Sequence, residues 1–168
     1  MRARIRMGSA CLTFPDTIMP DTSTDWRAHL VEDDDGIRRI IEQTHRIAVL
    51  GIKTPESDQS AYHVPEYLQK SGFEIVPVPV YYPDVTEILG QRVYRTLAAI
   101  PGPVDLVDVF RRPKDIPAHL DDIIAKRPKA VWFQQGIRND DAAERLAREG
   151  IDVVQDHCLM IEVRRIGR

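Results

Sequence analysis

Short apolar runs alternate along the chain with stretches in which apolar residues recur every three or four positions. The runs are rich in β-branched residues, as is typical of buried parallel strands, and the stretches have the period of amphipathic helices. The pattern predicts strands at about 46–51, 74–78, 104–110, 130–133 and 151–154, and helices from residue 33, at about 62–72, 115–127 and 139–150, and near the C-terminus. Strands and helices that alternate across short loops predict a doubly wound α/β fold, with a mainly parallel sheet and helices on both faces.

Prolines set two boundaries in this prediction. Pro65 lacks an amide hydrogen, so the helix that contains it is expected to begin near Tyr62. Pro77 and Pro79 remove donors from one edge of the second strand, which should therefore end there. A short extended piece is expected near 92–94.

The chain has 168 residues, which is enough for one domain with a sizeable core. Residues 1–24 lack a sustained period, so we expect a loosely ordered tail ahead of one domain at 25–168. The net charge of −3 gives no general attraction for nucleic acid or an anionic membrane surface. No apolar run approaches the roughly 20 residues of a membrane-spanning helix.

The cysteines and histidines do not form a recognisable site. Cys11 and Cys158 lie at opposite ends of the chain, so reduced thiols and a cytoplasmic location are expected rather than a disulfide. The five histidines have no paired ligand spacing, and no metal is expected.

The loop after the first strand is the first place to look for a nucleotide site. A dinucleotide fingerprint needs a G-x-G-x-x-G loop there and an acidic residue near the end of the second strand. Only Gly51 is present, no acid occurs at 78–80, and Glu74 lies at the other end of that strand. This pattern disfavours NAD and is compatible with NADP or coenzyme A (CoA).

Several sequence blocks resemble a known family. The blocks are Gly51, Ser60–Val64, Val76–Pro79, Gly90–Tyr94, Val107–Pro113, Trp132–Gly136 and Asp156–Cys158. They resemble the small stand-alone CoA-binding (Rossmann-like) proteins, which are similar to the CoA-binding domain of the succinyl-CoA synthetase α subunit. The resemblance covers roughly residues 40–166 and implies a CoA-binding module without the domain that bears the synthetase's phosphorylated histidine. His63 replaces a frequent arginine, and Val80-Tyr81-Tyr82 replaces a common Asn-Pro.

The resemblance and the residue chemistry together predict a ligand site at the carboxyl ends of the strands. Its expected residues are Gly51, Ile52, Lys53, Ser60, Ala61, Tyr62, His63, Val78, Pro79, Val80, Phe110, Arg111, Arg112, Gln134, Gln135, Gly136 and Cys158.

The cations among these residues suit the phosphates of CoA. Arg111 and Arg112 lie between a strand end and a helix start, where guanidinium groups and backbone amides both favour phosphate. Lys53 is placed to reach the diphosphate or the 3′-phosphate. The alternatives are a solvated arginine pair and an exposed loop lysine.

The uncharged candidates suit the rest of the ligand. Val78 and Pro79 are expected to form the apolar wall of the adenine site. Tyr81 and Tyr82 either stack on adenine or pack against the protein. The Gln135–Gly136 turn either presents amides near the pantetheine path or is an ordinary strand-to-helix turn.

Two polar groups have a structural and a functional interpretation. Asp108 either orients a loop or is a hydrogen-bonded structural aspartate. Asp156, His157 and Cys158 are adjacent in the chain, where side chains seldom converge, so a catalytic arrangement is not expected. Cys158 is either a small buried residue or a thiol that forms a mixed disulfide with CoA under oxidation.

The predicted function is non-catalytic binding of CoA or a short acyl-CoA, with a regulatory or sensing role. One alternative is a component of an acyl-CoA ligase or transferase that needs a partner subunit. The other is a regulatory module that binds NADP or another nucleotide. A homodimer or a further protein partner is compatible with each of these functions. Replacing Gly51 by Val is expected to block the ligand more than it harms folding, provided that φ there is negative.

Overall fold

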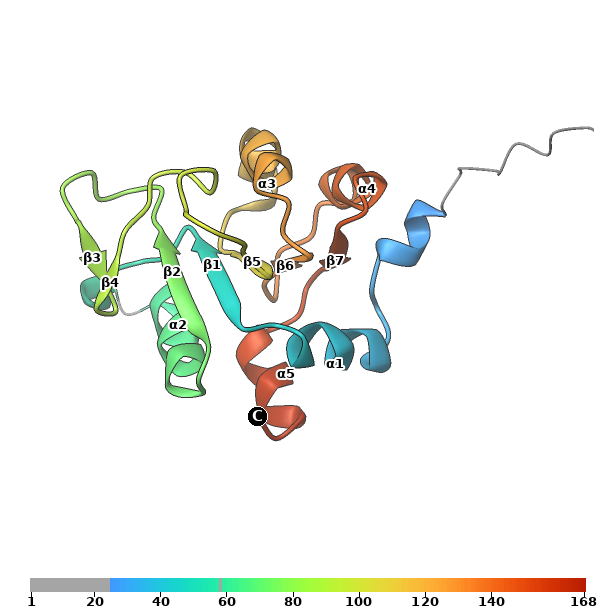
Figure 1. Ribbon diagram of the computed structural model, residues 1–168, viewed down its shortest axis with the longest axis horizontal. Helices are drawn as coiled ribbons and strands as arrows, with labels where there is room; N and C mark the ends of the chain where they lie inside the picture. Colours follow the sequence, from blue (N-terminus) through green and yellow to red (C-terminus); the bar gives the residue numbers. More distant parts are fainter. Residues whose placement is uncertain (1–24, 58) are drawn as a thin grey trace, which may run out of the picture.

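A five-stranded parallel sheet with strand order β2-β1-β5-β6-β7 forms the centre of the molecule. The computed structural model describes residues 25–57 and 59–168, so the tail expected at 1–24 lies outside the described residues. The strands are β1 (Arg46–Leu50), β2 (Glu74–Val78), β5 (Leu106–Val109), β6 (Ala130–Phe133) and β7 (Asp152–Val154), with a separate hairpin of β3 (Glu87–Ile88) and β4 (Gln91–Arg92). The predicted parallel α/β architecture is confirmed (Figure 1).

Helices cover both faces of the sheet and create two apolar cores. The α-helices are α1 (Asp34–Glu42), α2 (Ser60–Lys70), α3 (Leu120–Lys126), α4 (Asp140–Arg148) and α5 (Leu159–Arg165), and the 3-10 helices are η1 (Trp26–His29), η2 (Pro55–Ser57) and η3 (Pro113–His119). In Figure 1, α3 and α4 lie on one face and α1, α2 and α5 on the other. Alternate residues of β5 therefore enter different cores, with Val107 on the α3–α4 side and Leu106 on the other.

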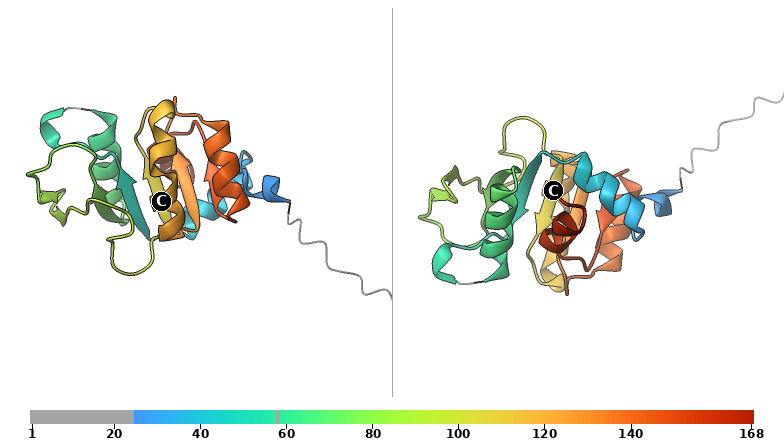
Figure 2. Two further views of the ribbon diagram at one scale, coloured as in Figure 1. Left: turned by 90° about the horizontal axis from the view of Figure 1, so that it is seen from above. Right: turned by 90° about the horizontal axis from the view of Figure 1, so that it is seen from below.

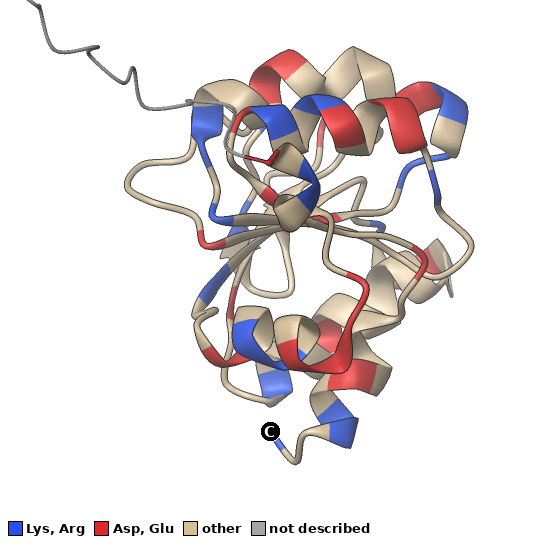
Figure 3. Cartoon of the chain, turned by 90° about the vertical axis from the view of Figure 1, so that its right-hand side faces the viewer, with Lys and Arg blue, Asp and Glu red and all other residues tan. Residues whose placement is uncertain are grey.

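Charged residues lie mainly on the helices and loops that enclose the sheet. On the side of the molecule in Figure 3, basic and acidic positions alternate along the outer helices. No helix among the described residues is long and apolar enough to cross a membrane.

The helix after β1 begins two residues earlier than expected. Its first residue is Ser60, not Tyr62, and Pro65 lies inside it. Pro65 cannot donate to the carbonyl of Ala61, but that carbonyl accepts the amide hydrogen of Lys53 at 3.1 Å instead. A contact from the preceding loop thus satisfies the group that the proline leaves open, and the helix can start earlier.

The prediction of a single helix at 115–127 was wrong. The segment is divided into η3 and α3, because Pro117 lacks the amide hydrogen needed for continuous α-helical bonding. The strand predicted at 104–110 is shorter and spans Leu106–Val109. Of the extended piece expected near 92–94, only Arg92 belongs to a strand, at the end of the β3–β4 hairpin.

The segment at 25–31 packs beside β7, the strand at one edge of the sheet. Leu30 forms a parallel bridge with Val153, and η1 lies against α4 (Figure 2). His29 Nδ1 lies 2.6 Å from Asp152 Oδ1, which fixes the segment to the start of β7. The bridge between Leu30 and Val153 extends the sheet beyond its five strands.

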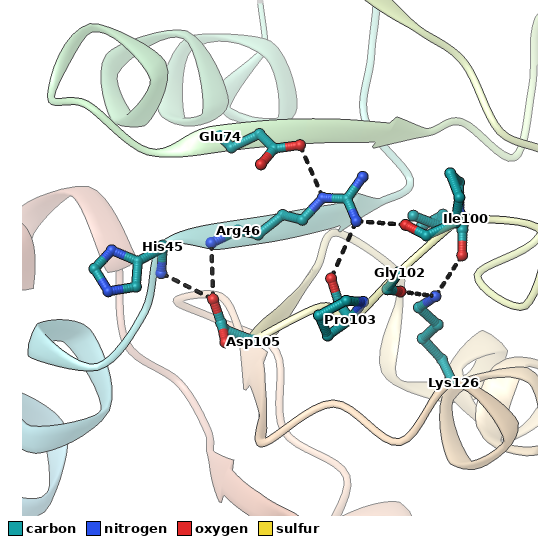
Figure 4. Close-up of polar contacts among 9 residues, drawn as sticks. His45, Arg46, Glu74, Ile100, Gly102, Pro103, Asp105 and Lys126 are labelled. Carbon is teal, nitrogen blue, oxygen red and sulfur yellow. Dashed lines mark hydrogen bonds and ion pairs between the residues drawn. The ribbon is translucent and has the colours of Figure 1, made fainter.

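Polar contacts fix the amino ends of the strands. Arg46, the first residue of β1, donates from Nη1 to two carbonyl oxygens of the turn 100–103, at 2.6 and 3.1 Å. Lys126 of α3 donates to the other two carbonyl oxygens of that turn (Figure 4). Asp105 accepts two backbone amide hydrogens at the start of β1, and Glu74 of β2 pairs with Arg46 at 2.8 Å. The turn is thereby fastened to the end of the sheet that lies opposite the predicted ligand site.

Candidate functional site

Gly51 connects β1 to the loops at the carboxyl end of the sheet. Its φ is +87°, and its amide donates to the carbonyl of Val78 at 2.9 Å. A Cβ at this position would lie 2.5 Å from the carbonyl oxygen of Phe110. The condition of a negative φ is therefore not met, and a side chain at Gly51 would harm folding directly as well as obstruct the loops.

The larger of two hollows at this end of the sheet, here called the groove, has a volume of about 580 Å³. It lies between the loop after β1 with the start of α2, the loop after β5, and the turn after β6. Its lining residues are Lys53, Gln59, Ser60, Ala61, Phe110, Arg111, Arg112, Pro113, Gly136 and Ile137.

The smaller hollow, here called the pocket, has a volume of about 300 Å³ and lies over the ends of β1 and β2. Its lining residues are Leu50, Val78, Pro79, Val80, Tyr81, Pro83, Arg95, His119 and Asp122. The predicted apolar wall of Val78 and Pro79 is thus in the pocket, while the predicted cations are in the groove.

A contact between two cations and one aromatic ring separates the groove from the pocket. Lys53 Nζ lies 4.3 Å from the centre of the Tyr81 ring, and Arg111 Cζ lies 5.5 Å from the same centre. The Arg111 guanidinium also approaches the Tyr81 hydroxyl, at 3.5 Å, and lowers its pKa below the usual value. Tyr81 therefore holds positive charge at the boundary between the two hollows.

The two predicted arginines differ in their surroundings. Arg112 is 67% exposed and binds Asp115 at 2.7 Å, a contact that lowers the pKa of the Asp115 carboxyl. Arg111 is only 12% exposed and lies 3.7 Å from the same carboxylate. The buried Nε of Arg111 has no hydrogen-bond partner among the described residues. Arg111 is thus the better fixed of the two guanidinium groups and retains unused hydrogen-bonding capacity.

The turn after β6 is held from the opposite side of the groove. The Gly136 amide donates to Asp156 Oδ1 at 2.6 Å, and the Asp156 amide donates to the carbonyl of Ile137 at 3.2 Å. Asn139 caps α4 and also donates from Nδ2 to the carbonyl of Pro113 at 2.8 Å. Because the Gly136 amide already donates to Asp156, it is not free to bind a ligand. The turn instead contributes shape and apolar surface to the groove.

Several predicted site residues line neither hollow. Ile52 is buried in the core, and Gln134 is buried beside Asp108. The remaining ones are Gly51, Tyr62, His63, Gln135 and Cys158.

Asp108 lies in the core beneath this end of the sheet. It is fully buried, and its Oδ1 accepts a hydrogen bond of 2.8 Å from Gln134 Nε2. Its Oδ2 has no partner among the described residues. Burial raises the pKa of the Asp108 carboxyl to about 7. The side chain is a structural group that joins β5 to the turn after β6.

Asp156, His157 and Cys158 have separate contacts. Asp156 holds Gly136, as described above, while His157 Nδ1 lies 3.2 Å from Glu162. Cys158 is the half-buried N-cap residue of α5, and no side-chain capping bond is formed there. The contacts of Asp156 and His157 thus lead to different elements, and the absence of a catalytic arrangement stays a prediction. A mixed disulfide at Cys158 stays a prediction.

The prediction missed lining residues that come from distant segments. Gln59, Pro113 and Ile137 flank predicted residues, so their neighbours in sequence were a usable signal. Arg95 and His119 had no such signal, because the loop after the hairpin and the end of η3 reach the pocket only through the tertiary fold. No group of three or more histidine, cysteine, aspartate or glutamate side chains suited to a metal occurs in the described part of the chain.

Comparisons with known proteins show the family of this chain. A family model described as a CoA binding domain matches residues 45–164. The uncharacterized protein YneT of Bacillus subtilis (strain 168) is 33% identical over 125 residues, which cover 74% of this chain and 90% of that protein.

Solved structures show the same fold. The structure of cell-free ID.343 from Thermus thermophilus has a TM-score of 0.73 and 37% identity, over 80% of this chain and 99% of that one. A hypothetical protein from Pyrococcus horikoshii OT3 has the same TM-score and 31% identity, over 80% of this chain and 92% of that one. An acetyl-coenzyme A synthetase from Ca. Korarchaeum cryptofilum, solved with phosphate and ADP, has a TM-score of 0.54 and 19% identity, over 64% and 25%, and shares the fold alone.

Proposed function

This chain belongs to the CoA-binding domain family, and we propose that it binds CoA or a short acyl-CoA without catalysing a reaction. The observation that carries the proposal is the pair of adjoining hollows at the carboxyl ends of the parallel strands, with Lys53 and Arg111 at the boundary between them. Ligands of open α/β sheets bind at this end. We further propose that residues 25–168 act as one domain in the cytoplasm, with a regulatory or sensing role.

The shape and charge of the hollows suit the three parts of CoA. The pocket has apolar walls at Val78 and Pro79 and receives the adenosine end. Lys53 and Arg111, at the boundary, receive the diphosphate, because charge-assisted hydrogen bonds from cations favour phosphate oxygens. The groove beyond them has the larger volume, about 580 Å³ against about 300 Å³, and receives the pantetheine arm between Phe110 and Ile137.

The surroundings of the nearest reactive groups support binding without catalysis. A nucleophilic cysteine needs a base within hydrogen-bond reach. His157 is paired with Glu162, and Cys158 lines neither the groove nor the pocket. Turnover of an acyl-CoA by the chain together with a co-purifying subunit would contradict this part of the proposal and favour a ligase or transferase component.

Calorimetry of the reduced protein with four ligands tests the proposal. We expect CoA to bind with roughly micromolar affinity, dephospho-CoA more weakly, and NADP more weakly still because it has no pantetheine arm for the groove. Acetyl-CoA is expected to match CoA if the thiol end stays outside the contacts. The absence of heat and of competition with all four ligands would refute CoA binding, while a preference for NADP would favour a nucleotide-binding module.

A further inference from the structure

Most polar side chains that line the pocket are already engaged in the protein. Arg95 donates to the carbonyl oxygens of Tyr82, Pro83 and Val85, and so shapes the loop above the pocket. Asp122 accepts two backbone amide hydrogens from the loop at 97–98, at 2.7 and 3.0 Å. The hydroxyl group of Tyr81 faces Arg111.

His119 differs from these residues. It lies at the end of η3, its ring is half-buried, and it lines the pocket together with Leu50 and Val78. Within the described residues, no hydrogen bond or ion pair engages its ring nitrogens, and neither nitrogen is a fully buried unpartnered atom. The imidazole therefore presents unused hydrogen-bonding capacity to the space inside the pocket.

The surroundings of His119 favour the neutral form of its ring. Burial, assisted by the positive charge of Arg111, lowers the pKa of the His119 imidazole below its usual value, and Asp122 and Asp115 oppose this only in part. A neutral imidazole has one donor and one acceptor. This combination suits a nucleobase edge or a sugar hydroxyl, whereas an ionised phosphate only accepts hydrogen bonds and would leave the acceptor nitrogen unused.

We propose that His119 binds the ligand directly, with a hydrogen bond to the adenine base or the ribose of CoA in the pocket. The inference rests on the proposed function and adds to it a residue that selects the nucleoside end. The apolar walls contribute affinity for the base, and His119 contributes the polar contact that fixes its orientation. The phosphates interact instead with Lys53 and Arg111.

The first test compares the affinity of four proteins for CoA. Relative to the unchanged chain, His119→Ala is expected to bind CoA about five- to tenfold more weakly, as for the loss of one hydrogen bond. His119→Asn keeps a donor and an acceptor and should recover part of the loss. The matched control is His45→Ala, because the exposed His45 lies at the amino end of β1, away from the pocket (Figure 4).

The second test locates the lost contact on the ligand. Adenosine 3′,5′-bisphosphate, used as a competitor, should lose affinity for His119→Ala by the same factor as CoA. The ratio of CoA to dephospho-CoA affinity should stay unchanged, because His119 does not hold the 3′-phosphate. A collapse of that ratio, or an unchanged affinity for the bisphosphate, would overturn the assignment.

The outcomes separate the two proposals. If the unchanged chain binds none of these ligands, the proposed function fails and the role of His119 fails with it. If the unchanged chain binds CoA and both His119 variants bind CoA as tightly as the unchanged chain, only the inference about His119 fails. Unfolding curves of the variants establish that each protein is folded at the temperature of the binding experiment.

Discussion

At the scale of single residues, the surroundings of a side chain decide its contribution more than its type does. Arg111 and Arg112 are adjacent and chemically identical, yet one is nearly enclosed and the other is 67% exposed. An exposed ion pair, such as that between Arg112 and Asp115, contributes little free energy. The fixed guanidinium of Arg111 has already lost most of its conformational freedom and is better prepared to bind an anion.

Removing both arginines tests the phosphate contact. The double substitution Arg111→Ala and Arg112→Ala should weaken CoA binding by about 2–4 kcal/mol, as expected for the loss of charge-assisted phosphate contacts. Most of the loss should appear in Arg111→Ala alone. Calorimetry of the single and double variants measures this, with Arg145→Ala on the surface of α4 as the control. Full affinity in a folded double variant would place the phosphate site elsewhere.

The buried carboxyl of Asp108 predicts an unusual dependence of stability on pH. Its pKa is about 7 in the folded chain and near 3.8 when exposed, so between these values the folded state holds more protons than the unfolded state. The free energy of unfolding should therefore fall as the pH rises from about 4 to 7, and this contribution should level off above pH 7.

Asp108→Asn removes this dependence while it preserves the shape of the side chain. The stability of the variant relative to the unchanged chain should increase from pH 4 to pH 7, by on the order of a few kcal/mol. Urea unfolding at a series of pH values measures the difference. Parallel curves for the two proteins would mean that Asp108 is ionised in the fold.

At the scale of elements, the ends of a helix were predictable where a capping residue or a glycine in the local sequence sets them. Asn139 and Gly150 mark the two ends of α4, and both the cap bond and the positive φ of the glycine are present. The division of the segment after β5 was not predicted, because the helical period of its apolar residues continues across Pro117. The early start of α2 depends on a contact from Lys53, which the helix's own sequence does not contain.

The residues of the candidate site also divide into those that a local sequence signal predicts and those that it does not. Residues that directly follow a strand, such as Lys53 and Arg111, were predictable because parallel strands end at one edge of the sheet. Arg95 and His119 reach the pocket from a loop and a 3-10 helix whose paths depend on long-range packing. Periodicity contains no information on such paths.

The two roles of Asn139 can be separated by comparison with Asp33, which caps α1 alone. Asp33→Ala should cost about 1 kcal/mol of stability and leave CoA affinity unchanged. Asn139→Ala should cost a similar amount for the cap, and should also weaken CoA binding because it releases Pro113 at the groove. Thermal unfolding and calorimetry of both variants measure these effects. Equal CoA affinity for the two variants would mean that the bond to Pro113 does not shape the site.

At the scale of the whole molecule, the two ends of the sheet differ in the structures that they hold. The carboxyl end has the groove and the pocket, and the amino end has the turn 100–103 that Arg46 and Lys126 hold. Five parallel strands lie between them. Changes at the amino end should therefore affect stability far more than ligand binding.

Lys126→Met tests this separation. It removes both hydrogen bonds to the turn 100–103 but keeps an apolar stem, and should lower the free energy of unfolding by about 1–3 kcal/mol because charged donors are lost. CoA affinity, measured below the unfolding temperature, should stay within about twofold of the original, a difference of less than 1 kcal/mol. A large loss of affinity would mean that the two ends of the sheet are coupled.

The way in which both edges of the sheet are covered also bears on solubility. Exposed strand edges are templates for aggregation through added strands. On β2, Pro77 removes an outward donor, and its carbonyl oxygen is taken by Tyr94. On β7, Leu30 and the amide of Val31 occupy the edge at Val153. A chain shortened to begin at Asp33 would leave β7 open, and its tendency to form intermolecular sheets would rise even though every residue that lines the groove and the pocket would remain.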